Sequence, residues 1–155
     1  MIDKEDRYSI ITTAIGAVLL LAATAFLVFK WTSLPDQVIT NYGVTGQPER
    51  YGSPGNLIKL LVVGWGMFWV LTFIEMNPKF AQVRFKVKEE YKEKAGMIVT
   101  RMIGVIKVIL AFHFSYTVVA SIKDLVMPEW YMIVFYLALF DVAVLNLGRV
   151  FRMRK

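Results

Sequence analysis

Three ionisable side chains, Lys107, His113 and Asp141, lie within long apolar stretches in the second half of the sequence. Ionisable residues inside a membrane span are costly, and they usually pair with one another or mark a route for protons or ions. Lys107 precedes Ser121 by 14 residues, and Asp141 follows Glu129 by 12, on either side of a short turn. On helices that rise about 1.5 Å per residue, these depths differ by roughly 3 Å. The spacing therefore predicts an ion pair between Lys107 and Asp141.

Such a pair has more than one interpretation. It would orient two helices, or it would belong to a proton or ion pathway together with His113. Alternatively, Lys107 extends to the nearer membrane interface without a partner. His113 follows Lys107 by six residues, which is about 240° around a helix, so the two side chains lie on different faces. We expect His113 to form a hydrogen bond between helices.

The remaining residue types argue against catalysis. The sequence contains one histidine and no cysteine, whereas a metal site draws on several histidine, cysteine or carboxylate ligands. It also shows no nucleophile with a nearby base, no phosphate-binding glycine loop and no paired carboxylates. We therefore expect no catalytic residues, no metal, no cofactor and no enzymatic activity.

The elements that must position these side chains follow from composition. Of the 155 residues, 57% are hydrophobic and 19% are charged, compared with about 45–50% and about 25% in a typical soluble domain. A membrane helix needs about 20 mostly apolar residues. Four stretches of this kind span 9–31, 57–76, 97–122 and 129–148. The sequence predicts a single all-α domain over residues 1–155, a bundle of four transmembrane helices in the lipid bilayer.

The positive charge follows the topology of these spans. The net charge is +6, and 13 of the 18 lysine and arginine residues lie in the N-terminus, in 79–101 and in the C-terminus. Short cytoplasmic loops carry such an excess. Both termini are therefore predicted to be cytoplasmic, and the loop 32–56 is predicted to be an ordered extracytoplasmic loop. Because topology explains the charge, we expect no nucleic-acid partner.

The two long loops differ in kind. Residues 32–56 contain three of the five prolines and four of the ten glycines, which indicates turns, with a short strand predicted at 37–42. Residues 77–96 combine apolar side chains at helical spacing with many charges. This pattern favours a segment on the membrane surface, followed from Lys88 onward by a cytoplasmic extension of the third helix. The alternation at 83–87 also allows a strand.

The loop 32–56 resembles the signature of a bacterial membrane family called domain of unknown function 1648. The resemblance is carried by Leu34-Pro35, Thr40-Asn41-Tyr42, Gly46-Gln47-Pro48-Glu49 and Tyr51-Gly52-Ser53, and further along by Asn77-Pro78 and Lys107. Three positions depart from the pattern. Asn41 stands where the family usually has histidine, Glu49 replaces aspartate and Pro54 replaces lysine. A histidine would have supplied a metal ligand and a group that titrates near neutral pH.

The resemblance implies a multi-pass protein of the bacterial cytoplasmic membrane that acts in binding, sensing or immunity. Some relatives are SdpI-like immunity proteins, which protect bacterial membranes from a secreted peptide toxin, sequester a repressor and carry a second membrane domain. We therefore expect a peptide or another membrane protein as the partner. Small residues in the spans suit packing within one chain, and they also allow an oligomer.

The candidate binding residues of the loop are Leu34, Pro35, Asp36, Asn41, Tyr42, Gly46, Pro48, Glu49, Tyr51 and Gly52. The alternative function is that of a small transporter or proton-linked channel subunit, built around Lys107, His113 and Asp141.

Overall fold

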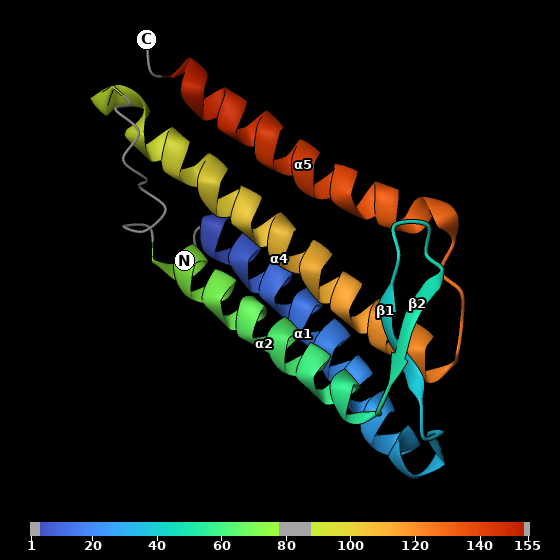
Figure 1. Cartoon of the computed structure of the whole chain (residues 1–155). Helices are drawn as coiled ribbons and strands as arrows, with labels where there is room; N and C mark the ends of the chain where they lie inside the picture. Colours follow the sequence, from blue (N-terminus) through green and yellow to red (C-terminus); the bar gives the residue numbers. More distant parts are fainter. Residues whose placement is uncertain (1–3, 78–87, 154–155) are drawn as a thin grey trace.

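The computed structural model describes residues 4–77 and 88–153, and four long helices dominate this part of the chain (Figure 1). The helices are α1 (Lys4–Lys30), α2 (Gly55–Met76), α4 (Lys92–Ile122) and α5 (Glu129–Arg152). Each is long and apolar enough to cross a membrane, so the predicted helical bundle is confirmed. The helices extend beyond the predicted spans because hydropathy locates only the apolar part of a helix, whereas charged residues continue it at either end.

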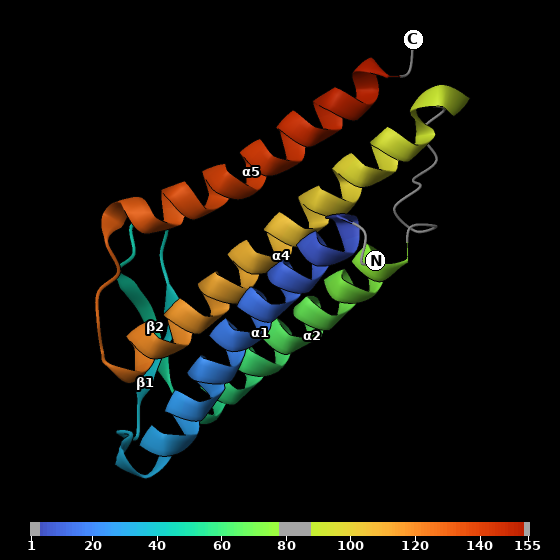
Figure 2. The ribbon, with the colours of Figure 1, turned by 180° about the vertical axis from the view of Figure 1, so that it is seen from behind.

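α4 is the central helix of the bundle. It lies beside α1 and α2 on one side and beside α5 on the other (Figures 1 and 2). Leu20 of α1, Phe68 of α2 and Ala111 of α4 form a buried cluster between the first three helices. α5 joins the bundle through α4, where Val150 packs in a cluster with Val99. α4 therefore positions both of the regions in which polar side chains meet.

A short hairpin lies at the end of the bundle where α1 ends and α2 begins, which we call the hairpin end. A 3-10 turn, η1 (Trp31–Ser33), leads into the strands β1 (Val38–Tyr42) and β2 (Pro48–Gly52). The strands are antiparallel, with Val38 opposite Gly52 and Tyr42 opposite Pro48. β1 confirms the strand predicted at 37–42. The sequence does not predict β2, because proline, glycine and charged residues are depleted in strands.

The opposite end of the bundle, which we call the termini end, contains the start of α4. A 3-10 turn, η2 (Glu89–Tyr91), precedes the helix. The helix predicted from Lys88 onward therefore begins with this turn and becomes α-helical at Lys92. The predicted surface segment and its alternative, a strand at 83–87, fall on 78–87, which lies outside the described residues.

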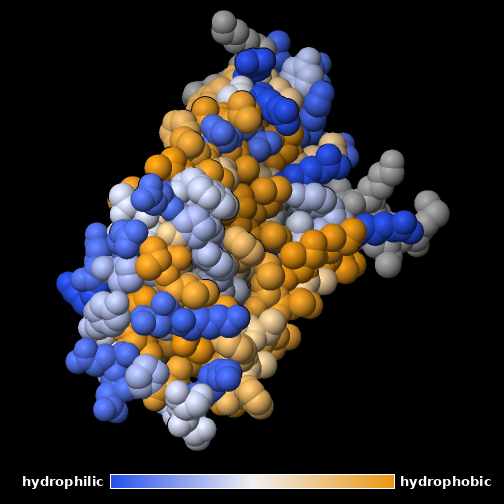
Figure 3. All heavy atoms as spheres, turned by 90° about the vertical axis from the view of Figure 1, so that its right-hand side faces the viewer, coloured by the Kyte–Doolittle hydropathy of each residue, from blue (hydrophilic) through white to orange (hydrophobic). Residues whose placement is uncertain are grey.

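Large apolar side chains cover the flanks of the bundle. Phe29, Trp69 and Phe140, on three different helices, are each more than half exposed. Seen from the hairpin side, hydrophilic side chains gather on one part of the surface and a broad hydrophobic area adjoins them (Figure 3). Helices that are apolar on their outward faces as well as their inward faces are typical of membrane spans.

Candidate functional site

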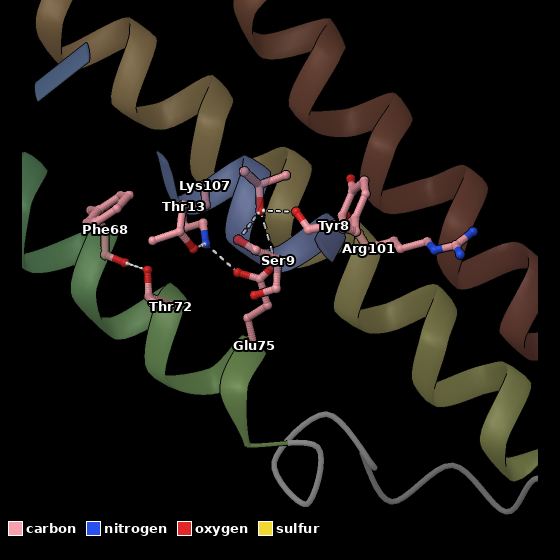
Figure 4. A network of polar contacts seen from close by, with 9 residues as sticks. Tyr8, Ser9, Thr13, Phe68, Thr72, Glu75, Arg101 and Lys107 are labelled. Atoms are coloured by element: carbon pink, nitrogen blue, oxygen red, sulfur yellow. Dashed lines mark hydrogen bonds and ion pairs between the residues drawn. The ribbon is translucent and has the colours of Figure 1, made fainter. Parts of the chain in front are cut away.

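The polar centre of the bundle is an ion pair between Lys107 of α4 and Glu75 of α2 (Figure 4). The exposed fraction of both side chains is 0%. The predicted pair of Lys107 with Asp141 is wrong, because Asp141 lies on an exposed face of α5. The predicted alternative, an unpaired Lys107 that extends to the interface, is wrong as well. Equal depth on neighbouring helices does not fix the faces on which two residues lie.

Two threonines of α1 complete the surroundings of the ion pair. Lys107 Nζ donates to Thr13 Oγ1 at 2.7 Å, and Thr12 Oγ1 donates to Glu75 Oε1 at 3.2 Å. The Phe68 ring centroid lies 5.6 Å from Lys107 Nζ, within the range of a cation–π contact. Both carboxylate oxygens thus have a donor, and the two charges balance. Such pairing offsets much of the desolvation cost of two buried charges, and it joins three helices at one point.

Gly104 of α4 makes room for this close approach of helices. A Cβ atom at this position would lie 2.8 Å from Glu75 Oε1 and 3.0 Å from Tyr8 Cε1. The Tyr8 hydroxyl donates to the carbonyl oxygen of Arg101 at 3.2 Å, and the Arg101 guanidinium lies 5.9 Å from the Tyr8 ring centroid. The polar contacts therefore extend from Lys107 toward the termini end, along the seam between α1 and α4 (Figure 4).

Gly104→Ala should destabilise the protein by about 1–3 kcal/mol, because an added methyl group overpacks a close contact. The methyl group would displace the Glu75 carboxylate from Thr12. Unfolding of the purified variant in detergent measures the effect. Gly96→Ala is the matched control on the same helix, since a Cβ there meets nothing within 4 Å. That variant should be as stable as the parent or slightly more stable, because alanine favours helix over glycine. Equal behaviour of the two variants would contradict the close approach.

His113 lies at the contact between α4 and α5, away from the ion pair. Its Nδ1 is 3.2 Å from the Tyr131 hydroxyl, and its ring stacks on Phe135 with the centroids 3.9 Å apart. This is the hydrogen bond between helices that the sequence predicts. Lys107 contacts α1 and α2, whereas His113 contacts α5. The structure therefore does not bring Lys107, His113 and Asp141 together.

The hairpin is fastened to the turn between α4 and α5. The Met127 amide donates to the carbonyl oxygen of Gly46 at 3.0 Å, and the Tyr42 hydroxyl donates to the carbonyl oxygen of Leu125 at 3.1 Å. Burial raises the pKa of the Tyr42 phenol, so the phenol stays a donor at neutral pH. Gly46 has φ 77°, a left-handed conformation that glycine adopts without cost. Tyr42 and Gly46 therefore anchor the hairpin.

The other candidate residues of the loop divide by exposure. Leu34 packs against the buried cluster that contains Leu27 and Val38, and Pro48 and Gly52 are partly buried. The exposed candidates are Pro35, Asp36, Asn41, Glu49 and Tyr51. Among these, the Asn41 side-chain amide donates to Glu49 Oε2 at 3.1 Å. The exposed residues of the hairpin, and not its anchors, are accessible to a partner.

Glu75 is the polar site residue that sequence reasoning misses. It is the last residue but one of α2, a position typical of a membrane interface. α4 is longer than α2 and begins 15 residues before Lys107, so the middle of α4 reaches the end of α2. A usable signal was Thr12-Thr13 near the start of α1. Antiparallel helices place the start of α1 beside the end of α2, where these hydroxyls suit a carboxylate.

Comparison with known proteins adds no relative. No family model, no curated protein and no solved structure matches this chain. Among the residues that the structure describes, no group of three or more histidine, cysteine, aspartate or glutamate side chains could hold a metal ion. Function must therefore follow from the geometry of the hairpin and the helices.

Proposed function

We propose that this protein binds, without catalysis, an extended segment of a peptide or of another membrane protein along strand β2. The observation that supports this function is the asymmetry of the hairpin. In β1, Val38 and Ile39 are 3% and 0% exposed and pack into the core. In β2, Glu49, Arg50 and Tyr51 are all exposed. One strand holds the hairpin in place, and the other faces outward.

The backbone of β2 offers a second edge for pairing. In the described part of the chain, β2 pairs only with β1. The free edge of a strand carries N–H and C=O groups on which an extended segment adds as a further strand. Glu49 and Arg50 supply opposite charges, and Tyr51 supplies an aromatic ring that is 51% exposed. Because the hairpin is anchored at Gly46 and Tyr42, little ordering of the strand is required on binding.

We infer the side of the membrane on which the hairpin lies from the distribution of charge. An excess of lysine and arginine toward the termini end favours a cytoplasmic location for that end, and hence an extracytoplasmic location for the hairpin end. The resemblance of the loop to domain of unknown function 1648 supports the cytoplasmic membrane of a bacterium. It also makes a secreted peptide a suitable partner.

The alternative, a small transporter or proton-linked channel subunit, has less support. An ion route requires ionisable groups that line one path. Lys107 is fully buried against Glu75, His113 lies at the contact with α5, and Asp141 is exposed on the outer surface.

A photo-crosslinking amino acid in place of Tyr51 tests the binding function in intact cells. We expect a covalent adduct with one partner segment. The same amino acid in place of Tyr91, an exposed tyrosine near the termini end, is the matched control and should give no such adduct. The captured segment, made as a synthetic peptide, should bind the purified protein. Tyr51→Ala should weaken that binding about 5- to 30-fold, as expected for an aromatic residue central to an interface.

Two outcomes would contradict the proposal. One is equal adduct formation from both tyrosine positions, and the other is unchanged affinity of the peptide for Tyr51→Ala.

The side of the membrane on which the hairpin lies is tested separately, by labelling single cysteines. The parent chain has no cysteine of its own to react. A membrane-impermeant maleimide should label Tyr51→Cys in intact cells and should leave Tyr91→Cys unlabelled. The reverse result would place the hairpin in the cytoplasm.

A further inference from the structure

α5 is the least covered of the four spans. Of the residues in its most apolar stretch, 17% are buried within the protein, against 28–33% in the other three spans. α5 lies at the outside of the bundle (Figures 1 and 2), and α4 is the helix on which it mainly packs. The start of α5 also meets the hairpin, since Tyr131 and Met132 share a buried cluster with Ile39 of β1. Its outward side carries a row of residues spaced alternately four and three apart, which we call the α5 seam. The seam consists of Trp130, Val134, Leu137, Asp141, Val144 and Gly148.

The α5 seam has the spacing of residues at which two helices pack side by side in a left-handed pair. Its apolar side chains, Trp130, Val134, Leu137 and Val144, are between 48% and 62% exposed. A Cβ atom at Gly148 would meet nothing within 4 Å. A small residue of this kind lets a second helix come close within a membrane.

Asp141 stands in the middle of the seam and is the one charged residue between Trp130 and Gly148. It follows Trp130 by eleven residues and precedes Arg149 by eight, distances of roughly 16 Å and 12 Å along a helix. No group in the described part of the chain pairs with its carboxyl. By contrast, 9–29 and 60–74 contain no charged residue. An outward-facing carboxyl within an apolar span calls for a polar partner, and the described residues do not supply one.

We infer that the α5 seam is the contact surface for a second copy of this chain, with the two α5 helices parallel. In a two-fold pair whose axis crosses the membrane, each seam residue meets its counterpart at the same depth. Asp141 of one copy then faces Asp141 of the other. Two-fold symmetry thus gives each of these carboxyl groups a polar group at its own depth in the membrane.

A second copy fits this surface better than a helix of a different protein. A second copy necessarily has a polar group at the depth of Asp141, because it has the same residue there. Its α5 seam also has the same alternating spacing of four and three residues. Lys107, a cation within an apolar span, is already paired with Glu75 and is not a partner for Asp141. A single polar residue at such a position also fixes the register of two helices, which apolar contacts alone leave open.

Single cysteines along 134–148 test the seam in the purified protein reconstituted in lipid vesicles. The parent chain has no cysteine to interfere. Oxidation should give dimers with cysteine at Val134, Leu137, Val144 and Gly148. It should give few with cysteine at Tyr136, which is 55% exposed but lies about 100° around the helix from Leu137. Cross-linking without this periodicity, or a protein that stays monomeric at all protein-to-lipid ratios, would overturn the inference.

Substitutions separate the polar contact from apolar packing. Asp141→Asn keeps a hydrogen bond between the copies and should leave the dimer intact. Asp141→Leu should lower the association constant about 5- to 30-fold; an unchanged or higher constant would overturn the role of Asp141.

Gly148→Ile should block the close approach of the two α5 helices and weaken the dimer. Gly66→Ile is the matched control, because a Cβ there also meets nothing within 4 Å but lies on α2. Equal weakening by both glycine variants would overturn the location of the contact.

Discussion

Lys107→Met should lower the free energy of unfolding by about 3–5 kcal/mol, the cost of removing one partner from a buried ion pair. Methionine fills much of the space of the lysine side chain, so the main change is electrostatic. The Glu75 carboxylate would remain 0% exposed, with the Thr12 hydroxyl as its donor and no opposite charge. Tryptophan fluorescence during titration with a denaturing detergent measures the loss, since the chain has four tryptophans.

The double variant Lys107→Met, Glu75→Leu is the decisive comparison. Replacing both partners by apolar residues of similar size is often neutral or stabilising, so the double variant should recover most of the lost stability. Lys59→Met is the matched control, because Lys59 is exposed on α2 and bonds only Asn56 at 3.3 Å among the described residues. This variant should change stability by less than about 0.5 kcal/mol. A single variant as stable as the parent, or a double variant no better than the single, would contradict a tightly coupled pair.

The same double variant distinguishes the two functions considered for this protein. If the ion pair only holds α1, α2 and α4 together, a stable double variant should keep the crosslink from position 51. If Lys107 and Glu75 carry protons or ions, the double variant should fold but should no longer transport protons or ions. The threonines favour a structural role for the ion pair, because Thr12 and Thr13 contact both partners from α1. Both charged side chains are also 0% exposed.

The sequence predicts the helices well and the polar contacts poorly, for a physical reason. Membrane helices follow from the local density of apolar residues, and the four spans could be located from composition. The partner of Lys107 depends on the offset between α2 and α4 and on the rotation of each helix about its axis. Residue counts from a turn give depth alone, and they therefore pair Lys107 with Asp141, although its partner in the structure is Glu75.

In the loop 32–56, too, features set by neighbouring residues could be predicted, whereas features set by residues far away in sequence could not. Prolines and glycines predict its turns, and β1 falls where a strand is expected. The separation of its residues into anchors and exposed positions could not be predicted, because it depends on the turn between α4 and α5. That turn is about 80 residues away in sequence, and it meets the loop at Gly46 and Tyr42.

Gly46→Ala should release the hairpin from this turn, at a cost of about 2–5 kcal/mol of local stability. A left-handed conformation costs a non-glycine residue about 1–2 kcal/mol, and Gly46 has φ 77°. The remainder is steric, since the added Cβ atom would lie 2.5 Å from the carbonyl oxygen of Met127. That neighbour is backbone and cannot turn aside. Hydrogen exchange of the Met127 amide measures the release, because this amide donates to Gly46.

Gly55→Ala is the control for this last variant, since a Cβ there lies 3.5 Å from Ser53 Oγ, an ordinary contact. It should leave exchange of the Met127 amide unchanged. In Gly46→Ala the amide should exchange faster, and the crosslink from position 51 should weaken as β2 loses its fixed position. Faster exchange with an undiminished crosslink would mean that the partner itself orders β2 on binding. The anchor at Gly46 would then not be needed for the proposed binding function. Unchanged exchange would contradict the anchor at Gly46.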